Sequence, residues 1–447
     1  MRRLPANANA RAWGQRVYAS LLVAGLLVGG SGPLVGATVA EPAEGLQGRL
    51  IVGYQGWFGC PNDAPGNTRW EHWFHNNDPV ASQLAVDLLP SIGQFADEDL
   101  CKTQLRRRDG SMIRLFSSQN ARVVATHFRW MREHGIDGAA VQRFVGPLAT
   151  PSQKQRSDRV LRNARAAAEA NERVFYVTYD ISGADAGTVI NDIRRDWRYL
   201  VDDLKITASP RYLRVNNNPV LQLWGFGFKD RPGSSAAVSM LITDLKRGRE
   251  NLSPVTLIGG VPAHWRTLDG DSQSDPAWAG IYRSYDVLSP WSVGRFRDNT
   301  GADRFIRQRV LPDIAETTRL GIAYMPVIFP GFSWFNLQKG RGETKLAILN
   351  QIPRRCGNFL WHQVSGLLAA RVDMVYAAMF DEVDEGTALF PTEPRADSVP
   401  SGGQMAFLNQ DGCALADDWY LRIVGKAAHQ LRQREIVSGN LEAVMRR

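Results

Sequence analysis

The chain has 447 residues, of which 44% are hydrophobic and 22% are charged. This balance is ordinary for a globular protein, and it excludes both a disordered chain and a protein built mainly of membrane-spanning helices. The 53 basic and 45 acidic residues give a net charge of +8 and form no basic tract, which argues against nucleic acid as a partner.

The first 40 residues have the composition of a secretory signal. Four arginines carry the only charges before Glu41, the apolar run Tyr18–Gly30 follows, and small residues lead to an expected cleavage between Ala37 and Glu41. An uncleaved membrane anchor is the alternative, but the run is shorter than the ~18 apolar residues of a membrane span. We therefore predict a signal peptide over 1–40 and a soluble mature chain over 41–447, secreted or periplasmic, with no stable membrane insertion.

Short β-rich runs alternate with longer helical patterns through the rest of the chain. The candidate strands are Leu50–Tyr54, Gly138–Gln142, Val174–Tyr179, Val220–Trp224, Val255–Gly260, Val287–Ser289, Tyr324–Phe329 and Val375–Phe380. The clearest helical patterns are Ala121–His134, Ser152–Glu172, Ala186–Leu204, Ala302–Leu320 and Asp418–Arg434. The count of eight rests partly on expectation, because the sixth run is short and no obvious helix precedes it. The alternation predicts an α/β fold, a single-domain (β/α)8 TIM barrel.

Two long segments have no regular pattern. Gln55–Asn120 follows the first candidate strand, and Asp381–Asp417 follows the last. Long irregular loops in a compact domain are usually functional. Because both follow strands, we expect both at the carboxyl face of the barrel, where such enzymes keep their active sites.

The chain contains four cysteines: Cys60, Cys101, Cys356 and Cys413. An even number in an exported chain favours two disulfides. Among the three possible connectivities we expect the neighbour pairing, Cys60–Cys101 and Cys356–Cys413. Four free buried thiols are the alternative. The wide spacing, without a C-x-x-C motif, argues against a zinc site.

An acidic cluster, Asp381-Glu-Val-Asp-Glu385, emerges directly after the last candidate strand. In a helical turn, Glu382 and Glu385 would lie on one side with their Cβ atoms about 5–6 Å apart, and Gly386 would permit the tight turn. Two close carboxylates repel, so one pKa rises and the site holds an acid beside a base, as glycoside cleavage requires. A solvated acidic loop and a calcium site are the alternatives.

Aromatic and polar residues just past the predicted strands suit a glycan, because sugar rings stack on aromatic faces and their hydroxyls need hydrogen-bond partners. Core packing is the competing explanation for the tryptophans. The spacing of His72 and His75 suggests a metal, but without a third ligand a position in the cleft or in the loop's packing is favoured. Asn336 is a further polar candidate. The predicted substrate-binding residues are Tyr54, Gln55, Trp57, His72, Trp73, Gln142, Arg143, Tyr179, Asp180, Trp224, His264, Trp265, Trp291, Trp334 and Asp384.

Several motifs between Leu50 and Gly425 resemble glycoside hydrolases of the family 71/99-like group. The motifs are Gly53-Tyr-Gln-Gly-Trp-Phe-Gly-Cys60, Trp70-Glu-His-Trp73, Gly135-Ile-Asp-Gly138, Gln142-Arg-Phe144, Pro330-Gly-Phe-Ser-Trp334 and Phe380-Asp-Glu-Val-Asp-Glu-Gly-Thr387. In family 99, which comprises endo-acting α-mannosidases and mannanases, a Glu-Trp-Asn-Glu motif carries catalysis. The corresponding stretch here is Glu382-Val-Asp-Glu385, which keeps both glutamates and departs from the motif at Val383 and Asp384.

The resemblance implies a retaining mechanism in which Glu382 is the base toward the 2-hydroxyl of the substrate and Glu385 is the general acid/base. It implies an oligo- or polysaccharide substrate, α-mannoside-like or another 1,2-trans glycan, and no cofactor or metal. A xylosidase or arabinosidase is the alternative among enzymes. A glycan-binding barrel without catalysis and a calcium-stabilised surface protein are the alternatives from other classes.

Overall fold

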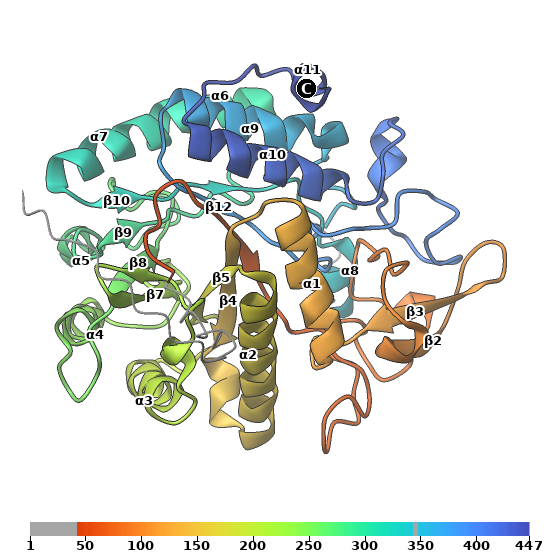
Figure 1. Ribbon diagram of the computed structural model, residues 1–447, viewed down its shortest axis with the longest axis horizontal. Helices are drawn as coiled ribbons and strands as arrows, with labels where there is room; N and C mark the ends of the chain where they lie inside the picture. The colour runs from red at the N-terminus through yellow and green to blue at the C-terminus, as the bar shows by residue number, and fades with distance from the viewer. Residues whose placement is uncertain (1–42, 343–346, 447) are drawn as a thin grey trace, which may run out of the picture. The chain divides into compact units, whose positions relative to one another are not determined.

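The computed structural model describes residues 43–342 and 347–446. The predicted signal peptide lies outside the described residues. The core is a mostly parallel sheet whose strands are buried on both faces (Figure 1). Its sequence order is β1 (Leu50–Tyr54), β4 (Gly138–Phe144), β5 (Val174–Asp180), β7 (Asn218–Trp224), β8 (Thr256–Gly260), β9 (Val287–Leu288), β10 (Ala323–Tyr324), β11 (Val327–Ile328) and β12 (Val375–Ala377). A two-residue strand, β6 (Arg214–Val215), pairs antiparallel with β7.

The sheet closes on itself through the segment Ala323–Ile328. Its first half, β10, pairs with β9, and its second half, β11, pairs with β12. Pro326 separates the halves because it has no amide hydrogen to donate, but its carbonyl still accepts a 3.0 Å hydrogen bond from the amide of Tyr376. β12 in turn pairs with β1. When β10 and β11 are counted as one interrupted strand, the sheet is a barrel of eight parallel strands, as the sequence predicts.

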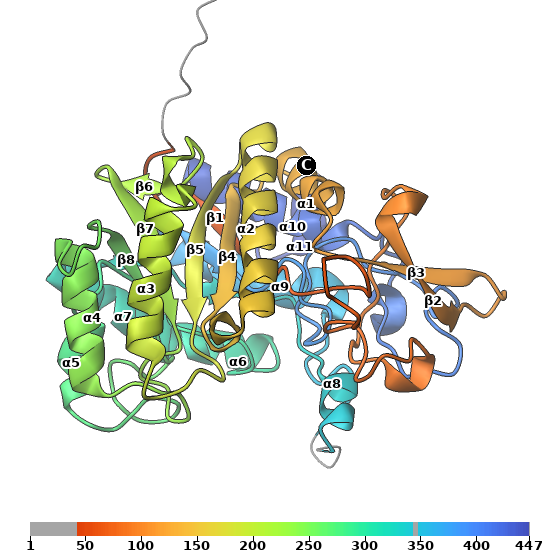
Figure 2. The ribbon, with the colours of Figure 1, turned by 90° about the horizontal axis from the view of Figure 1, so that it is seen from below.

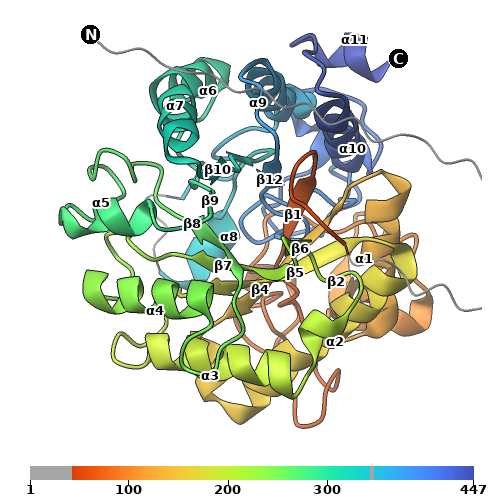
Figure 3. The same cartoon turned by 60° about the vertical axis from the view of Figure 1, so that its left-hand side comes forward.

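Helices surround the strands (Figure 3), and α2 and α3 pack along the outside of β4, β5 and β7 (Figure 2). Local signals set the helix ends, as in α4, where the Ser234 side chain accepts from the amide of Ala237 and Gly248 ends the helix in the left-handed region. The helices are α1 (Ala121–Glu133), α2 (Pro151–Asn171), α3 (Val189–Asp202), α4 (Ser235–Arg247), α5 (Ala277–Tyr282), α6 (Asn299–Phe305), α7 (Leu311–Leu320), α8 (Phe335–Gly340), α9 (Asn358–Ala369), α10 (Trp419–Gln433) and α11 (Leu441–Met445). A π-helical turn, Ile306–Val310, joins α6 to α7.

Two sequence expectations need correction. The sixth strand, β9, is preceded by a short helix, α5, which the periodicity did not reveal. The segment 55–120 is not irregular throughout, because β2 (Leu100–Arg106) and β3 (Met112–Phe116) form an antiparallel hairpin beside the barrel (Figure 1). The turn Asp109-Gly110 between them is a typical hairpin signal that could have indicated it.

Both predicted disulfides are present: Cys60–Cys101, with Cα atoms 6.4 Å apart, and Cys356–Cys413, with Cα atoms 6.1 Å apart. The first ties the hairpin to the loop that follows β1. Closing loops of this size restricts the unfolded chain, which stabilises the fold by about 3–4 kcal/mol per bridge. No helix among the described residues is long and apolar enough to cross a membrane.

Candidate active site

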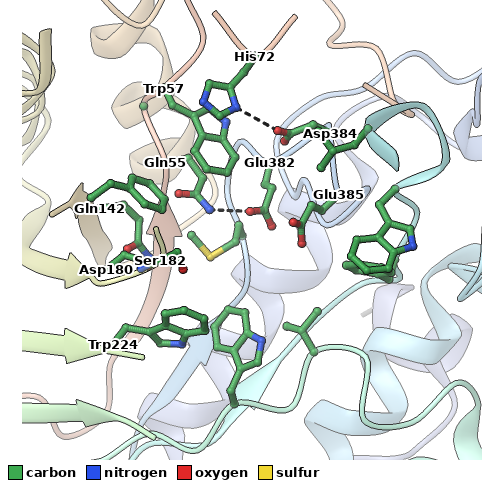
Figure 4. A pocket seen from close by; sticks show the side chains of 18 of the residues that line it. Gln55, Trp57, His72, Gln142, Asp180, Ser182, Trp224, Glu382, Asp384 and Glu385 are labelled. Carbon is green, nitrogen blue, oxygen red and sulfur yellow. Dashed lines mark hydrogen bonds and ion pairs between the residues drawn. The ribbon is translucent and has the colours of Figure 1, made fainter. Parts of the chain in front are cut away.

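The acidic segment 381–385 forms a turn directly after β12. The amides of Thr387 and Ala388 both donate to the carbonyl of Glu382, at 3.1 and 3.0 Å, and close the turn. Gly386 adopts a φ of +66°, and a Cβ atom there would lie 2.7 Å from the amide nitrogen of Ser333. The turn therefore requires glycine, and it directs both Glu382 and Glu385 into one cavity (Figure 4).

The cavity has a volume of about 880 Å³ and opens at the carboxyl ends of the barrel strands. Side chains from the loops after β1, β4, β5, β7, β9 and β11 line it together with the acidic turn. Its size is that of a pocket for a ligand of a few sugar rings. The residues predicted from the sequence that do line the cavity are Gln55, Trp57, His72, Gln142, Asp180, Trp224, Trp291, Trp334, Glu382, Asp384 and Glu385.

Glu382 is buried and is held through both carboxyl oxygens. The side-chain amide of Gln55 donates to Oε1 at 2.6 Å, and the hydroxyl of Thr387 donates to Oε2. Burial and the neighbouring charges of Glu385 and Asp384 raise the pKa of Glu382 well above its ordinary value, while the two hydrogen bonds act in the opposite direction. These donors fix the orientation of the carboxyl group and favour its charged form.

Glu385 is partly exposed to the cavity, and its carboxyl group makes no hydrogen bond or ion pair among the described residues. Burial and the charge of Asp384 raise the pKa of Glu385 to about 7. Two acids with raised pKa values lie side by side, so the pair shares a proton near neutral pH. Glu382 receives two hydrogen bonds that favour its carboxylate form, whereas Glu385 receives none among the described residues.

Asp381 connects the acidic turn to the end of β1. Its two oxygens accept from the backbone amides of Gln55 and Gly56, each at 2.8 Å. Full burial raises the pKa of Asp381 to about 7, against the effect of these two amides. The contacts join the turn after β12 to the end of β1, and they place Gln55 where its side chain reaches Glu382. With both oxygens engaged by backbone amides, Asp381 is a positioning residue, which speaks against a calcium site here.

One wall of the cavity is an aromatic stack. The ring of Trp57 stacks on His72, with centroids 4.1 Å apart, and on Phe144, with centroids 5.3 Å apart. His72 Nδ1 lies 3.4 Å from Asp384 Oδ2 (Figure 4). The stack therefore reaches the acidic turn through Asp384. Val383, the other departure from the family 99 motif, is fully buried in the core.

The opposite wall carries Trp224 and Trp291, which meet edge to face with centroids 5.3 Å apart. Asp180 lies near Trp224 (Figure 4), and burial raises the pKa of its carboxyl group to about 6. Several buried polar atoms that line the cavity have no hydrogen-bond partner among the described residues. They are Gln55 Oε1, Gln119 Oε1, Gln142 Oε1, Gln351 Oε1, Asp384 Oδ1, Arg156 Nη2 and the indole Nε1 atoms of Trp57, Trp224 and Trp334. Buried polar atoms need partners, and hydroxyl groups of a bound ligand would supply them.

Three predicted residues of the strands lie outside the cavity. The hydroxyl of Tyr54 bonds to His127 Nδ1 at 2.9 Å. Arg143 points outward to Asp158 and Asp196, and Tyr179 donates to Asp196 at 2.6 Å. Successive side chains of a strand face opposite sides, so each of these is excluded by the neighbour that does enter: Gln55, Gln142 or Asp180.

Four further predicted residues lie outside the cavity: Trp73, His264 and Trp265 in loops and Asn336 in α8. Trp73 is fully buried and donates to the carbonyl of Phe116 at 2.9 Å, and Trp265 is fully buried and donates to Asp313 at 3.0 Å. His264 is 2.8 Å from Asp271, and Asn336 is buried against Val86. Core packing, the competing explanation for the tryptophans, therefore accounts for Trp73 and Trp265.

The sequence analysis missed basic and small polar residues of the cavity, because isolated arginines and serines carry no spacing signal. They include Arg156, Ser182, Arg231, Arg295, Arg297, Arg341 and Gln351. The described residues contain no group of three or more metal-ligand side chains that could hold an ion. His75, considered above as a ligand, instead bonds to the carbonyl of Asn336 at 2.8 Å.

No protein-family model matches the chain, and no curated protein matches it in sequence. Solved structures do match in fold, among them two of the GH99 endo-alpha-mannosidase from Bacteroides thetaiotaomicron. One is 13% identical, with a TM-score of 0.59, covering 87% of this chain and 99% of that chain. The other, in complex with bis-tris-propane, is 14% identical, with a TM-score of 0.58 and coverages of 87% and 98%. The chain is thus similar in fold to a family 99 glycoside hydrolase, in agreement with the sequence resemblance.

Proposed function

We propose that this protein is a glycoside hydrolase that cleaves α-mannoside-like or other 1,2-trans glycans with net retention. The observation that carries the proposal is that Glu382 and Glu385 line one cavity together. Tryptophans line the same cavity, as do residues with polar atoms that have no hydrogen-bond partner among the described residues. The fold shared with an endo-α-mannosidase supports it. No ordinary packing requirement explains two buried acids without a basic partner at this position.

In the first step, Glu382 takes the proton of the substrate's 2-hydroxyl group. Oxygen O2 attacks the anomeric carbon and forms a 1,2-anhydro sugar, while the bond to the leaving oxygen breaks and that oxygen takes the proton of Glu385. The hydrogen bonds from Gln55 and Thr387 favour the charged form of Glu382 that this step needs. A pKa of about 7 for Glu385 suits a group that must be protonated before the step and charged after it.

In the second step, the charged Glu385 takes a proton from water, and the water oxygen attacks the anomeric carbon. The bond from O2 to that carbon breaks, and O2 regains its proton from Glu382. Two successive inversions give net retention. Attack by O2 requires O2 to lie anti to the leaving group. α-Mannosides meet this condition because both substituents are axial, whereas α-glucosides do not.

The test is steady-state kinetics of Glu382→Gln and Glu385→Gln on two substrates that differ only in their leaving group. Glu385→Gln should lose about 10²–10⁴-fold in rate on the poor leaving group, because general acid catalysis is lost. It should lose less on the activated one. Glu382→Gln should damage both, since the 2-hydroxyl must be deprotonated whatever leaves.

Glu71→Gln is the matched control, because Glu71 lines the same cavity outside the acidic turn, and it should keep near-parental rates. Circular dichroism confirms the fold of each variant. If both glutamine variants keep parental rates on a substrate that the parent cleaves, the assignment of the active site is wrong. A parent that binds glycans and cleaves none would instead be a glycan-binding barrel.

We also infer that the protein acts outside the cytoplasm, secreted or periplasmic, as a mature chain that begins between Thr38 and Glu41. The two disulfides support this inference, since such bonds persist in oxidising compartments. N-terminal sequencing of protein recovered outside the cytoplasm should start in this range. Met1 retained on a membrane-bound product would contradict the inference.

A further inference from the structure

A second hollow adjoins the active-site cavity. Arg295 and Arg297 line both the main cavity and an adjoining hollow of about 400 Å³. The second hollow is also lined by His264, Arg304 and Arg309. Because the same two arginines border both spaces, the hollow adjoins the main cavity at the loop after β9 and beside α6.

The positive charge in the hollow is largely unbalanced. Arg295 pairs with Asp271 at 2.8 Å. Arg297 and Arg304, by contrast, make no hydrogen bond or ion pair within 43–342 and 347–446, and Arg309 reaches only the hydroxyl of Thr267, at 3.3 Å.

Within the same described ranges, Asp298 is the one acid that lines the hollow, and one of its oxygens is engaged as the cap that accepts from the amide of Gly301 at 2.7 Å. Three arginines therefore line one small space. Arg309 is close enough to Asp269 to lower the pKa of that carboxyl group, so Arg297 and Arg304 are the two that have no close acidic partner among the described residues.

Some arginines near the hollow have acidic partners, such as Arg266 with Asp313 and Arg283 with Glu316. Others, such as Arg307 and Arg319, make no ion pair among the described residues but are single exposed charges. The hollow differs because several arginines gather around one space, and like charges gathered in one place repel and work against folding. This arrangement is therefore better suited to a ligand than to stability. The planar guanidinium group matches the oxygen atoms of sulfate, phosphate and carboxylate groups.

Building on the proposed function, we propose that the glycan bound by this cleft is acidic, and that its anionic groups bind to Arg297, Arg304 and Arg309 in the second hollow. The sugar ring to be cleaved lies at Glu382 and Glu385, and the charged substituents belong to residues of the same glycan further along the chain. The hollow thus selects acidic over neutral glycans of the same backbone.

The experiment compares binding of one polysaccharide in neutral and charged forms. The probes are an α-mannan, the same mannan after chemical sulfation, and the same mannan after oxidation of its primary hydroxyls to carboxylates. All proteins carry Glu385→Gln so that no probe is consumed. Each probe is titrated against the single variant, against Arg297→Ala/Arg304→Ala added to it, and against Arg307→Ala/Arg319→Ala added to it.

The second double variant is the matched control. Arg307 and Arg319 are exposed residues of the same helical region, they line neither space, and their loss changes the net charge equally. We expect charged mannan to bind roughly five- to tenfold more weakly after Arg297→Ala/Arg304→Ala, the effect of two exposed charges. The control should change binding less than twofold, and neutral mannan should bind all three proteins equally. The preference should fade between about 50 and 300 mM salt, since screening shortens the reach of exposed charges.

Equal losses in both double variants, or no gain from sulfate or carboxylate in the single variant, would overturn the proposal. Comparison of the sulfated and oxidised probes identifies the preferred anionic group. The result is separable from catalysis. A protein that prefers charged mannan through Arg297 and Arg304 but cleaves nothing refutes the proposed function alone. A protein that cleaves neutral glycans and gains nothing from charge refutes this inference alone.

Discussion

Two buried charged clusters flank β1, and they differ in how their charges are balanced. On one side, at the end of β4, Arg143 is surrounded by Asp158 and Asp196. On the other side, after β12, Glu382 and Glu385 lie close to each other without a basic residue in contact with either carboxyl group among the described residues. Arg143 lies in β4 and was predicted to bind substrate, and the two glutamates, which follow β12, were predicted to be catalytic.

The Arg143 cluster is nearly saturated with hydrogen bonds. Arg143 Nε lies 2.5 Å from Asp196, and its Nη2 lies 2.7 Å from Asp158. Tyr199 donates to Asp158 at 2.8 Å, and Tyr179 donates to Asp196. Burial alone would raise the pKa of Asp158, but the charge of Arg143 lowers it below its ordinary value. Such a cluster holds its charges permanently.

In the acidic pair the balance is reversed, because burial and like charges raise both pKa values. A proton therefore moves on and off this pair near neutral pH, which a catalytic acid and base require. The comparison teaches that burial of charge alone does not mark a catalytic site. A catalytic site is indicated where titratable groups are removed from solvent, have no residue of opposite charge in contact and lie next to an open cavity.

The largest effect that would test this contrast is on stability. Arg143→Met should cost about 3–5 kcal/mol in the free energy of unfolding, because two buried carboxylates lose the guanidinium group they share. Asp158 keeps its ion pair with Lys154 at 3.1 Å, whereas Asp196 keeps only the hydrogen bond from Tyr179. Urea denaturation monitored by circular dichroism measures it. Folded protein should keep its activity, since Arg143 does not line the cavity. Glu382→Gln should do the reverse, leaving stability near parental and removing activity.

Arg165→Met is the matched control for that experiment. Arg165 lies on α2, partly exposed, and pairs with Glu169 four residues on at 2.9 Å. Exposed pairs of this kind contribute about 0–1 kcal/mol. If Arg143→Met costs no more than Arg165→Met, or if it abolishes activity in fully folded protein, the assignment of Arg143 to a structural cluster is wrong.

The sequence predicted the barrel well because its evidence is local. Eight apolar runs and their intervening periodic stretches suffice to indicate parallel strands and covering helices, and the observed strands begin within two residues of the predicted positions. Gly386 and the spacing of the two glutamates likewise predicted the turn that brings them together. The hairpin β2–β3 was not predicted because the segment 55–120 has no helical periodicity and its two strands are separated from β1 by a long irregular stretch, although Asp109-Gly110 is a typical hairpin turn.

Prediction of the site was less complete because two neighbours at a strand end cannot both face the cavity. Tyr54 and Gln55 were both predicted, as were Gln142 and Arg143, and in each pair only the glutamine enters. Alternation along a strand excludes one member of each pair, but which member enters depends on the register of the barrel. The cavity arginines lie in loops, where only the folded chain reveals that they converge.

A smaller effect concerns pH and has opposite signs in the two clusters. Burial and Asp384 raise the pKa of Glu385 to about 7, against about 4.3 in an unfolded chain. Between these values the folded state binds more protons, so this group makes the protein less stable as pH rises through the window. Glu385→Gln should therefore raise the melting temperature relative to the parent at pH 8 and leave it unchanged at pH 4.

Asp158 should behave in the opposite way, because its pKa is lowered. It stabilises the folded state above its unfolded pKa, and that contribution is lost as pH falls through its folded pKa. Asp158→Asn should therefore lower the melting temperature at pH 8 and have little further effect in strong acid. Melting curves of both variants at pH 8 and pH 4, and of Asp158→Asn also in strong acid, measure the contrast. The same sign for both would show that the two clusters are not electrostatically distinct.

The smallest expected effect is on the fall of kcat/KM at alkaline pH. Its shift in three variants ranks the neighbouring charges by their effect on the pKa of Glu385. Activity should fall as pH rises past about 7, because Glu385 must be protonated in order to donate a proton to the leaving oxygen. Asp384 is the largest of the neighbouring charges that raise this pKa, and Asp180 is a lesser one, while Arg341 lowers it. Asp384→Asn should move the alkaline fall in activity to lower pH by less than about one unit. Asp180→Asn should move it to lower pH by a smaller amount, and Arg341→Gln should move it to higher pH.

Profiles of kcat/KM against pH for the three variants give the order directly. An alkaline fall that stays in place in Asp384→Asn, or that moves to higher pH, would mean that another group sets it and that Glu385 is not the acid.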